Sequence, residues 1–342
     1  FYESFLYLVF HWIVLATSWN LLSGYAGYFS FGHGAFFGAG VYTTAVLAGK
    51  FDVPFAWTLP AAALVAAALG VGLGAVVFRV RHVRGELFAL LTLAATFVLS
   101  TIVLNTPIDG GPGVYLSGVA VPKLGSFYVV ALVLALVAVG AAYAITRMRF
   151  GLGLFAIHDD EDAAEVMGVP TYSTKLVALG LSSALAGVAG GIQALFVSYV
   201  TANGTFNITV PLTVVLMSVL GGTRFWAGPA IGATVITVLL YATTAADQAV
   251  IGKAAVGAVL VAAILVMPEG ILGKAFAWWR KRMPVETRAV RVEGPAAASA
   301  TTAHRRRGDD AQPVLLAVRN VSKSFKGVRA LDGVDLDVRT GE

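Results

Sequence analysis

Side chains suited to bind a metal ion or to transfer protons are few in this chain. It has five histidines and no cysteine. The histidines are His11, His33, His82, His158 and His304. None of them stands roughly three to five residues from another, the spacing that paired ligands of zinc sites commonly have. The sequence therefore predicts no metal site.

Groups for acid–base or nucleophilic catalysis are missing from the apolar part of the chain. Residues 53–78, 126–146 and 225–246 contain no Asp, Glu, Lys or Arg. A catalytic centre needs a nucleophile beside a base, or a pair of carboxylates, and the apolar segments supply neither. We therefore expect no catalytic centre, and the hypothesis of a membrane enzyme is disfavoured.

These uncharged stretches indicate the fold class. Of the 342 residues, 58% are hydrophobic and 13% are charged, against about a quarter charged in soluble domains. Several uncharged stretches reach the roughly 20 residues that a helix needs to cross a bilayer, which favours a membrane protein over a large buried helical core. The formal net charge of +5 comes from short basic clusters between apolar segments, a pattern typical of membrane proteins rather than of nucleic-acid binding.

We predict an all-α polytopic membrane protein with about eight transmembrane helices, embedded in a lipid bilayer. The predicted spans are residues 4–23, 30–49, 53–78, 86–106, 126–146, 173–199, 227–246 and 250–267. Residues 205–222 are also uncharged but contain Pro211 and end in two glycines. This stretch is either a crossing or a broken, re-entrant helix.

Basic clusters predict which connections face the cytoplasm. The clusters are Arg79, Arg81 and Arg84, then Arg147 and Arg149, then Lys274, Arg280, Lys281 and Arg282. The connections at 107–125 and 200–208 hold almost no positive charge, so we place them on the opposite side. This parity requires residues 205–222 to return the chain to the cytoplasm at Arg224.

Three regions follow from the composition. Residues 1–283 form the predicted transmembrane domain. Residues 284–313 are rich in Pro, Ala, Thr and Arg and predict a flexible linker, whose arginine run is either solvated or in contact with anionic lipid headgroups. Residues 314–342 contain two strand-like runs and predict the beginning of a soluble domain.

Glycines are dense in residues 24–42, at positions 24, 27, 32, 34, 38 and 40. Glycine allows helices to approach closely. It also allows a membrane helix to break and expose its backbone to a solute. The residues leave open whether this segment serves packing or a transport pathway.

The same segment resembles the permease family of high-affinity branched-chain amino acid importers of the ABC type. The matching residues are Gly27, Ser30, Gly32, His33, Phe36, Gly38, Gly40 and Tyr42, while Phe31 and Val41 replace a leucine and an alanine. The resemblance implies a bacterial-type inner-membrane permease that works by alternating access. It further implies a second homologous permease, two ABC ATPase subunits or domains, and an extracytoplasmic solute-binding protein as partners.

A second resemblance lies in residues 151–175, which predict a short acidic surface helix that ends at Gly168 and Pro170. Its apolar face would comprise Ala156, Ala163, Ala164 and Met167. Asp162-Ala163-Ala164-x-x-x-Gly168 resembles the Glu-Ala-Ala-x-x-x-Gly signature of importer permeases, whose coupling helix passes ATPase closure to the membrane helices. The alternative is an ordinary acidic loop.

Residues 316–342 resemble the opening strands of an ABC ATPase. The resemblance assigns Phe325 to stacking on adenine. The sequence contains no Gly-x-x-x-x-Gly-Lys-Ser/Thr motif for phosphate binding, so we expect ATP and Mg²⁺ to be bound by an ATPase and no cofactor by residues 1–283. The first hypothesis for function is an importer permease for leucine, isoleucine and valine. Alternatives are a permease for urea, amides or sugars, and an ion-coupled carrier, which would place ionisable residues at the bilayer midplane.

Overall fold

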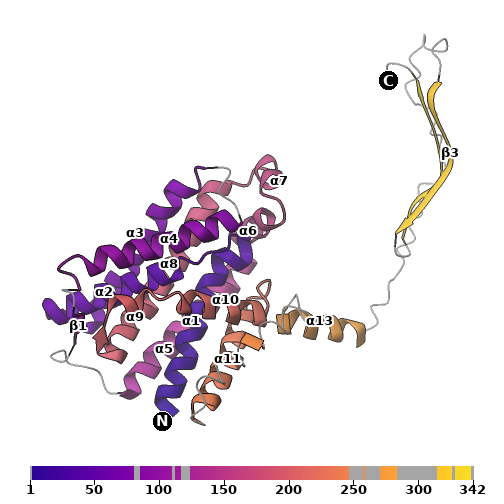
Figure 1. Cartoon of the computed structure of the whole chain (residues 1–342). Helices are drawn as coiled ribbons and strands as arrows, with labels where there is room; N and C mark the ends of the chain where they lie inside the picture. Colours follow the sequence, from indigo (N-terminus) through magenta and orange to yellow (C-terminus); the bar gives the residue numbers. More distant parts are fainter. Residues whose placement is uncertain are drawn as a thin grey trace. The chain divides into compact units, whose positions relative to one another are not determined.

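The computed structural model describes residues 2–80, 85–109, 112–116, 124–245, 257–258, 270–282, 314–325 and 328–339 (Figure 1). The chain divides into two compact units, Phe1–Pro284 and Val285–Glu342. In the described residues the first unit is almost entirely helical and the second contains two strands.

The first unit contains the following elements, in chain order. They are α1 (Tyr2–Ala26), α2 (His33–Lys50), α3 (Phe55–Val77), α4 (Glu86–Leu104), β1 (Val114–Tyr115), α5 (Leu124–Arg147), α6 (Arg149–Asp159), α7 (Glu161–Val166), α8 (Thr171–Val197), β2 (Tyr199–Val200), α9 (Ala202–Thr205), α10 (Thr209–Gly221), α11 (Gly228–Ala245) and α13 (Gly270–Arg282).

Six segments among the described residues are long and apolar enough to cross a membrane. They are Tyr2–Ala26, Phe55–Val77, Leu87–Leu104, Ser126–Arg147, Thr171–Val197 and Ala202–Gly221. The prediction of an all-α membrane protein is therefore confirmed, whereas the number of eight spans is not. Two predicted spans form the helices α2 and α11, which are not among these six. The third, residues 250–267, lies outside the described residues except at 257–258.

The stretch 205–222 is a broken helix. Helix α9 ends at Thr205 and α10 begins at Thr209, with Pro211 in its first turn, where a missing backbone N–H costs little. Together the two helices lead from β2 to the turn that holds Arg224, so the stretch returns the chain as the parity of the basic clusters requires.

Helix α8 packs against α1, α2 and α3 in the middle of the bundle (Figure 1). Glycines make these contacts close. A Cβ added at Gly40 of α2 would lie 1.9 Å from the backbone oxygen of Gly187 in α8, and one at Gly70 of α3 would lie 2.1 Å from Ser183 Oγ. A Cβ added at Gly232 of α11 would lie 1.8 Å from the Met217 oxygen of α10. At these positions the glycines serve helix packing.

The bundle has two ends, which we name by an element that lies there. At the α7 end, helices α1, α3, α5 and α10 end and α8 begins. Two contacts show that these ends lie together. The Tyr172 hydroxyl of α8 donates to the Ala75 oxygen of α3 at 3.3 Å, and Arg224 pairs with Asp159 of α6 at 3.0 Å. At the β1 end, Val114 pairs with Val200 in a short antiparallel ladder.

The basic clusters gather at the α7 end. Arg79 follows α3, and Arg147 and Arg149 flank the α5–α6 junction. Helix α13, which carries Lys274, packs on α10 and α11. The other predicted members of the first cluster, Arg81 and Arg84, lie outside the described residues. The described members of these three clusters thus lie at one end, as the charge pattern predicts, whereas Lys50 at the end of α2 lies at the β1 end.

The second unit forms a hairpin of two antiparallel strands, β3 (Val314–Phe325) and β4 (Val328–Arg339). Val318 pairs with Leu336 in the register, and Arg319 bridges to Asp337 at 2.5 Å across the strands. The predicted linker at 284–313 and the side chain of Phe325 lie outside what the structure describes.

Candidate functional site: an interrupted helix and the loop beneath it

The glycine-rich segment contains a break between two helices. Helix α1 ends at Ala26, α2 begins at His33, and residues 27–32 between them are not helical. Gly27 has a φ of 75°, a backbone conformation that glycine adopts without a steric penalty. Gly27 therefore permits the turn with which the break begins.

The broken segment folds back along α1 into the bundle. The Trp19 indole donates to the Ser30 oxygen at 2.7 Å, and the Ser30 amide donates to Ser23 Oγ at 3.2 Å. On its other side, the Phe31 amide donates to Thr92 Oγ1 of α4 at 3.0 Å. His33, the first residue of α2, lies beside Ser18, which is eight residues before the end of α1. At about 1.5 Å of rise per residue, α2 therefore starts about 12 Å deeper in the bundle than the end of α1. Helix α2 therefore begins within the bundle after a segment that reverses the chain, and irregular backbone at this depth occurs where protein buries it or where it lines a cavity.

His33 is buried at the start of α2, with 1% of its surface exposed. Its Nε2 lies 3.1 Å from Ser18 Oγ, and the Ser18 hydroxyl donates to the Leu15 oxygen at 2.8 Å. His33 Nδ1 is buried and has no hydrogen-bond partner among the described residues. No group of three potential metal ligands occurs in the described part of the chain.

The loop with the acidic signature differs from the single helix that was predicted over it. Helix α6 ends at Asp159 and α7 begins at Glu161, because Asp160 turns away and caps α7: its carboxylate accepts from the Ala163 amide at 2.9 Å. Gly168, at φ 88°, ends α7 with its own amide on the Glu165 oxygen and the next amide on the Ala164 oxygen, both at 3.0 Å.

The predicted apolar face of this loop is also divided. Ala164 is buried against the bundle, whereas Ala163 is exposed and Met167 is 83% exposed. Val166, 87% exposed, joins Met167 on the outer side. Helix α7 therefore presents an apolar tip outward, and the acidic Asp162 beside it is exposed as well.

Three buried polar side chains join the break to this loop. Lys175 of α8 lies 2.5 Å from Glu161 Oε1 of α7 and 3.0 Å from the Tyr28 hydroxyl. The Tyr28 hydroxyl also donates to Glu161 Oε2. The Lys175 ammonium stands over the rings of Tyr28 and Phe78, 4.6 and 5.0 Å from their centroids, within the usual range of cation–π contacts. Tyr28 further contacts Phe88 of α4 edge to face at 5.3 Å.

A second contact between the break and the loop involves His158 of α6. A Cβ added at Gly27 would lie 3.0 Å from His158 Nδ1, so α6 packs directly against the first residue of the break. Burial, and then the charge of Arg224, lower the pKa of His158, while Asp159 opposes them. The imidazole is therefore neutral at neutral pH.

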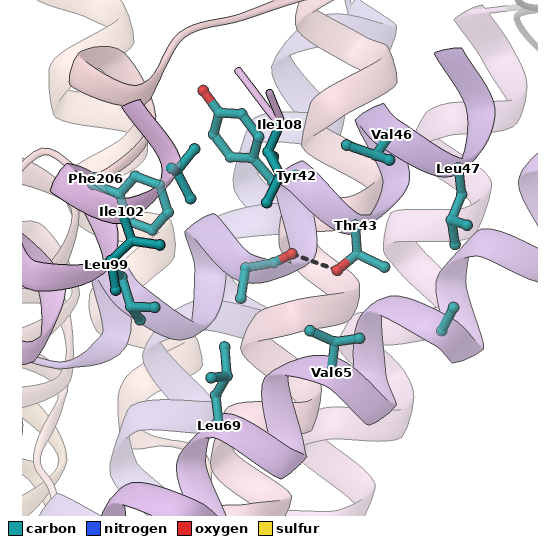
Figure 2. A pocket seen from close by; sticks show the side chains of 13 residues that line it. Tyr42, Thr43, Val46, Leu47, Val65, Leu69, Leu99, Ile102, Ile108 and Phe206 are labelled. Carbon is teal, nitrogen blue, oxygen red and sulfur yellow. Dashed lines mark hydrogen bonds between the residues drawn. The ribbon is translucent and has the colours of Figure 1, made fainter. Parts of the chain in front are cut away.

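An apolar pocket of about 430 Å³ lies nearer the β1 end (Figure 2). Its lining comes from α2, α3 and α4, together with Ile108 and Phe206. Tyr42 and Phe206 stack at 5.8 Å, and the Tyr42 hydroxyl donates to the buried Asp109 at 2.5 Å. The Thr43 hydroxyl, drawn with a dashed line in Figure 2, donates to the Ala39 oxygen at 2.7 Å. Aliphatic side chains such as Val65 and Leu69 form most of the wall.

The family described as branched-chain amino acid transport system / permease component matches residues 1–267, more than three quarters of the chain. The chain belongs to this permease family. Two curated relatives are the high-affinity branched-chain amino acid transport system permease proteins LivM of Escherichia coli and Salmonella typhimurium. Each is 29% identical in a 246-residue alignment that covers 62% of this chain and 56% of the relative. The probable branched-chain amino acid transport permease protein LivH of Methanocaldococcus jannaschii is 30% identical over 156 residues, 44% of this chain and 49% of the relative.

This permease therefore spans about half of the length of its curated relatives. No solved structure gave a significant match. The family and the six apolar segments together show a multi-pass inner-membrane protein, and its relatives are transport permeases rather than enzymes.

The motif residues of the permease fall into two groups that meet at the α7 end. Gly27, Ser30, Gly32 and His33 form the break and the start of α2, while Gly38 and Gly40 pack further along α2. Asp162, Ala163, Ala164 and Gly168 belong to α7 and its cap. Tyr28 and Glu161 bring the two groups together.

Sequence reasoning missed the residues that make this junction. The signal for one of them was present: Lys175 is the single charged residue in the 27 residues of α8, and a lone charge in an apolar membrane segment needs a buried partner. Glu161 stands among five acidic residues between Asp159 and Glu165, so no sequence pattern separates it from its exposed neighbours.

Proposed function

We propose that this chain is the permease component of an ATP-driven importer of branched-chain amino acids. The match to relatives named as permeases of branched-chain amino acid transport carries the substrate assignment. The pocket beside α2 supports it, because a wall made almost wholly of aliphatic and aromatic side chains suits an aliphatic substrate side chain. The non-helical segment 27–32 supports a pathway that opens and closes around α2.

Helix α7 is the proposed coupling helix, on the cytoplasmic side. Its two ends are capped by its own flanking residues, Asp160 and Gly168, so it is a compact projection. Val166 and Met167 point outward, and an exposed apolar tip on a short helix suits a groove on a partner protein. The partner we propose is an ABC ATPase, two copies of which would serve this chain and a second, homologous permease.

The second unit is proposed to be the first hairpin of an ABC ATPase domain, joined through a flexible linker at 284–313. Its two strands of 12 residues each are compatible with that role, and Phe325 at the end of β3 is the proposed adenine-stacking residue. ATP and Mg²⁺ would bind in the complete ATPase. The solute would reach the permease from an extracytoplasmic binding protein.

The substrate is tested by uptake into proteoliposomes. The permease is reconstituted with its ATPase, its partner permease and its binding protein, and uptake of radiolabelled leucine is measured with ATP inside. We expect uptake that requires ATP and that excess isoleucine or valine suppresses, while urea and ribose do not. If urea or ribose suppresses leucine uptake and isoleucine and valine do not, the proposed substrate class is wrong. Uptake driven by an ion gradient without ATP would replace the mechanism with an ion-coupled carrier.

The docking role of α7 is tested by the amount of ATPase that copurifies with the permease. Met167→Glu places a charge on the exposed apolar tip, and we expect copurification to fall at least about tenfold, the effect of losing about 1.4 kcal/mol of binding free energy. The matched control is Met148→Glu, since Met148 is exposed at the same end but lies between α5 and α6. Equal losses in both variants would rule out a specific role for α7.

A further inference from the structure

The buried charge of Lys175 needs a structural explanation. It is the single charged residue of α8 and only 4% of its surface is exposed. A charge in such a place is retained only when a counter-charge and hydrogen bonds compensate it. The compensation comes from two other parts of the fold, Glu161 of α7 and Tyr28 of the broken segment.

The three side chains bond one another in a closed triangle. Each polar group has the other two as partners: ammonium to carboxylate, ammonium to hydroxyl, and hydroxyl to the second carboxylate oxygen. The rings of Phe78 and Phe88 stack on each other at 5.4 Å beside Tyr28, which keeps water away. We call Tyr28, Glu161 and Lys175 the buried triad.

We propose that the buried triad transmits the movement of α7 to the start of α2. This inference rests on the proposed function, in which an ATPase moves α7. A displacement of α7 that left Tyr28 and Lys175 behind would separate two opposite charges in a site with little water, which is costly. The movement of lowest energy is therefore a concerted one, in which α7, the start of α8 and the segment 27–32 shift together.

The broken segment is suited to receive this movement. Residues 27–32 lack the hydrogen bonds of a continuous helix, and Gly27 places the backbone in a turn at their start. A few residues of this kind can absorb a change in backbone angles. Tyr28 is part of this segment and connects it to Glu161 and Lys175. Helix α2 begins five residues after Tyr28 and contributes Ala39, Tyr42 and Thr43 to the pocket wall.

A second ion pair at the same end provides a natural control. Arg224 and Asp159 are 3.0 Å apart, but their side chains are 67% and 70% exposed. Water can replace either partner, and exposed pairs contribute little. This pair connects α6 to the turn after α10 and includes no residue of α7.

The test measures leucine uptake and ATP hydrolysis in the reconstituted complex, and compares the number of leucine molecules taken up per ATP. Tyr28→Phe keeps the aromatic ring and the ion pair but removes the hydroxyl. Glu161→Gln/Lys175→Met removes both charges of the ion pair. Arg224→Gln is the control. Copurification of the ATPase measures assembly separately in each variant.

We expect uptake per ATP to fall at least about tenfold in Tyr28→Phe and in the double variant. This change corresponds to the loss of one hydrogen bond to a charged group. We expect both variants to retain ATP hydrolysis and assembly. Arg224→Gln keeps the wild-type ratio. A wild-type ratio in Tyr28→Phe, or a double variant that assembles and transports normally, would show that the triad only stabilises the fold and would overturn the proposal. A wild-type complex without ATP-driven leucine uptake would instead overturn the proposed function, and this inference with it.

Discussion

The two ends of the bundle each hold a buried carboxylate bonded to a tyrosine. At the α7 end, Glu161 accepts from Tyr28, and at the β1 end, Asp109 accepts from Tyr42. Both tyrosines belong to the stretch that comprises the broken segment and α2. Only the α7 end adds a cation, Lys175; among the described residues, none forms an ion pair with Asp109.

This difference indicates how α2 is held. At the β1 end a tyrosine bonded to an acid, together with Lys50 donating to the Pro107 oxygen at 2.6 Å, attaches α2 to the segment that follows α4. At the α7 end, the same kind of bond is reinforced by an ion pair and by the rings of Phe78, which follows α3, and Phe88 of α4. In the proposed mechanism, a movement of α7 therefore reaches α2 through the stronger attachment. The weaker attachment lies beside the pocket, and its geometry is the one that we expect to change.

The largest expected effect breaks the stronger attachment. Glu161→Gln leaves Lys175 buried without a counter-charge, and we expect the free energy of unfolding to fall by about 3–5 kcal/mol. Chemical denaturation of the purified permease in detergent measures it. The double variant Glu161→Gln/Lys175→Met removes the orphan charge and should recover most of the loss. A single variant as stable as the wild type would mean that the triad is not a compensated ion pair.

The second prediction concerns α2 itself, between the two tyrosines. Gly40→Ala would place its Cβ 1.9 Å from the Gly187 oxygen, so α2 and α8 must separate, at a cost of about 1–3 kcal/mol or more. Gly72→Ala on α3 is the control, because a Cβ there meets nothing within 4 Å. Thermal unfolding should be lowered by the first substitution and unchanged or slightly raised by the second.

The third prediction concerns the weaker attachment. Asp109→Asn keeps an oxygen that accepts from Tyr42 and leaves no charge unpaired, so we expect a loss of about 0.5–1.5 kcal/mol, well below that of Glu161→Gln. The same denaturation experiment measures both. Equal losses at the two ends would remove the distinction drawn between them.

The smallest effect is expected at the exposed ion pair. Arg224→Gln should change stability by less than about 0.5 kcal/mol, since the side chains of both partners are more than half exposed. Raising the salt concentration should abolish even this difference. A loss comparable to that of Glu161→Gln would show that the turn after α10 carries force as well.

The sequence predicts more of the fold than of the site. Long uncharged stretches are sufficient to predict membrane helices, because the bilayer sets both their length and their composition. The density of glycine in 24–42 favours close packing and a break equally, and both occur in the structure. The position of the break was not predictable, because it depends on Ser30 and Phe31 bonding to side chains of α1 and α4.

The site shows the same limit in the choice between two neighbouring acids. The signature matches at Asp162, which is exposed, while the buried carboxylate is that of Glu161. Which of them faces inward depends on the point where α7 begins, and Asp160 fixes that point by capping the helix. A pattern of residue types does not resolve a shift of one position.

The most direct test of the account measures whether the broken segment responds to the ATPase. The sequence has no cysteine, so Phe29→Cys, at a position that is 38% exposed, gives a single site for a nitroxide spin label in the permease, which is labelled before it is reconstituted with its partners. The account predicts that the label's spectrum changes between the nucleotide-free state and the state with a non-hydrolysable ATP analogue, and that this change is lost in the Glu161→Gln/Lys175→Met background. A change that persists in that background, or no change with the triad intact, would contradict it.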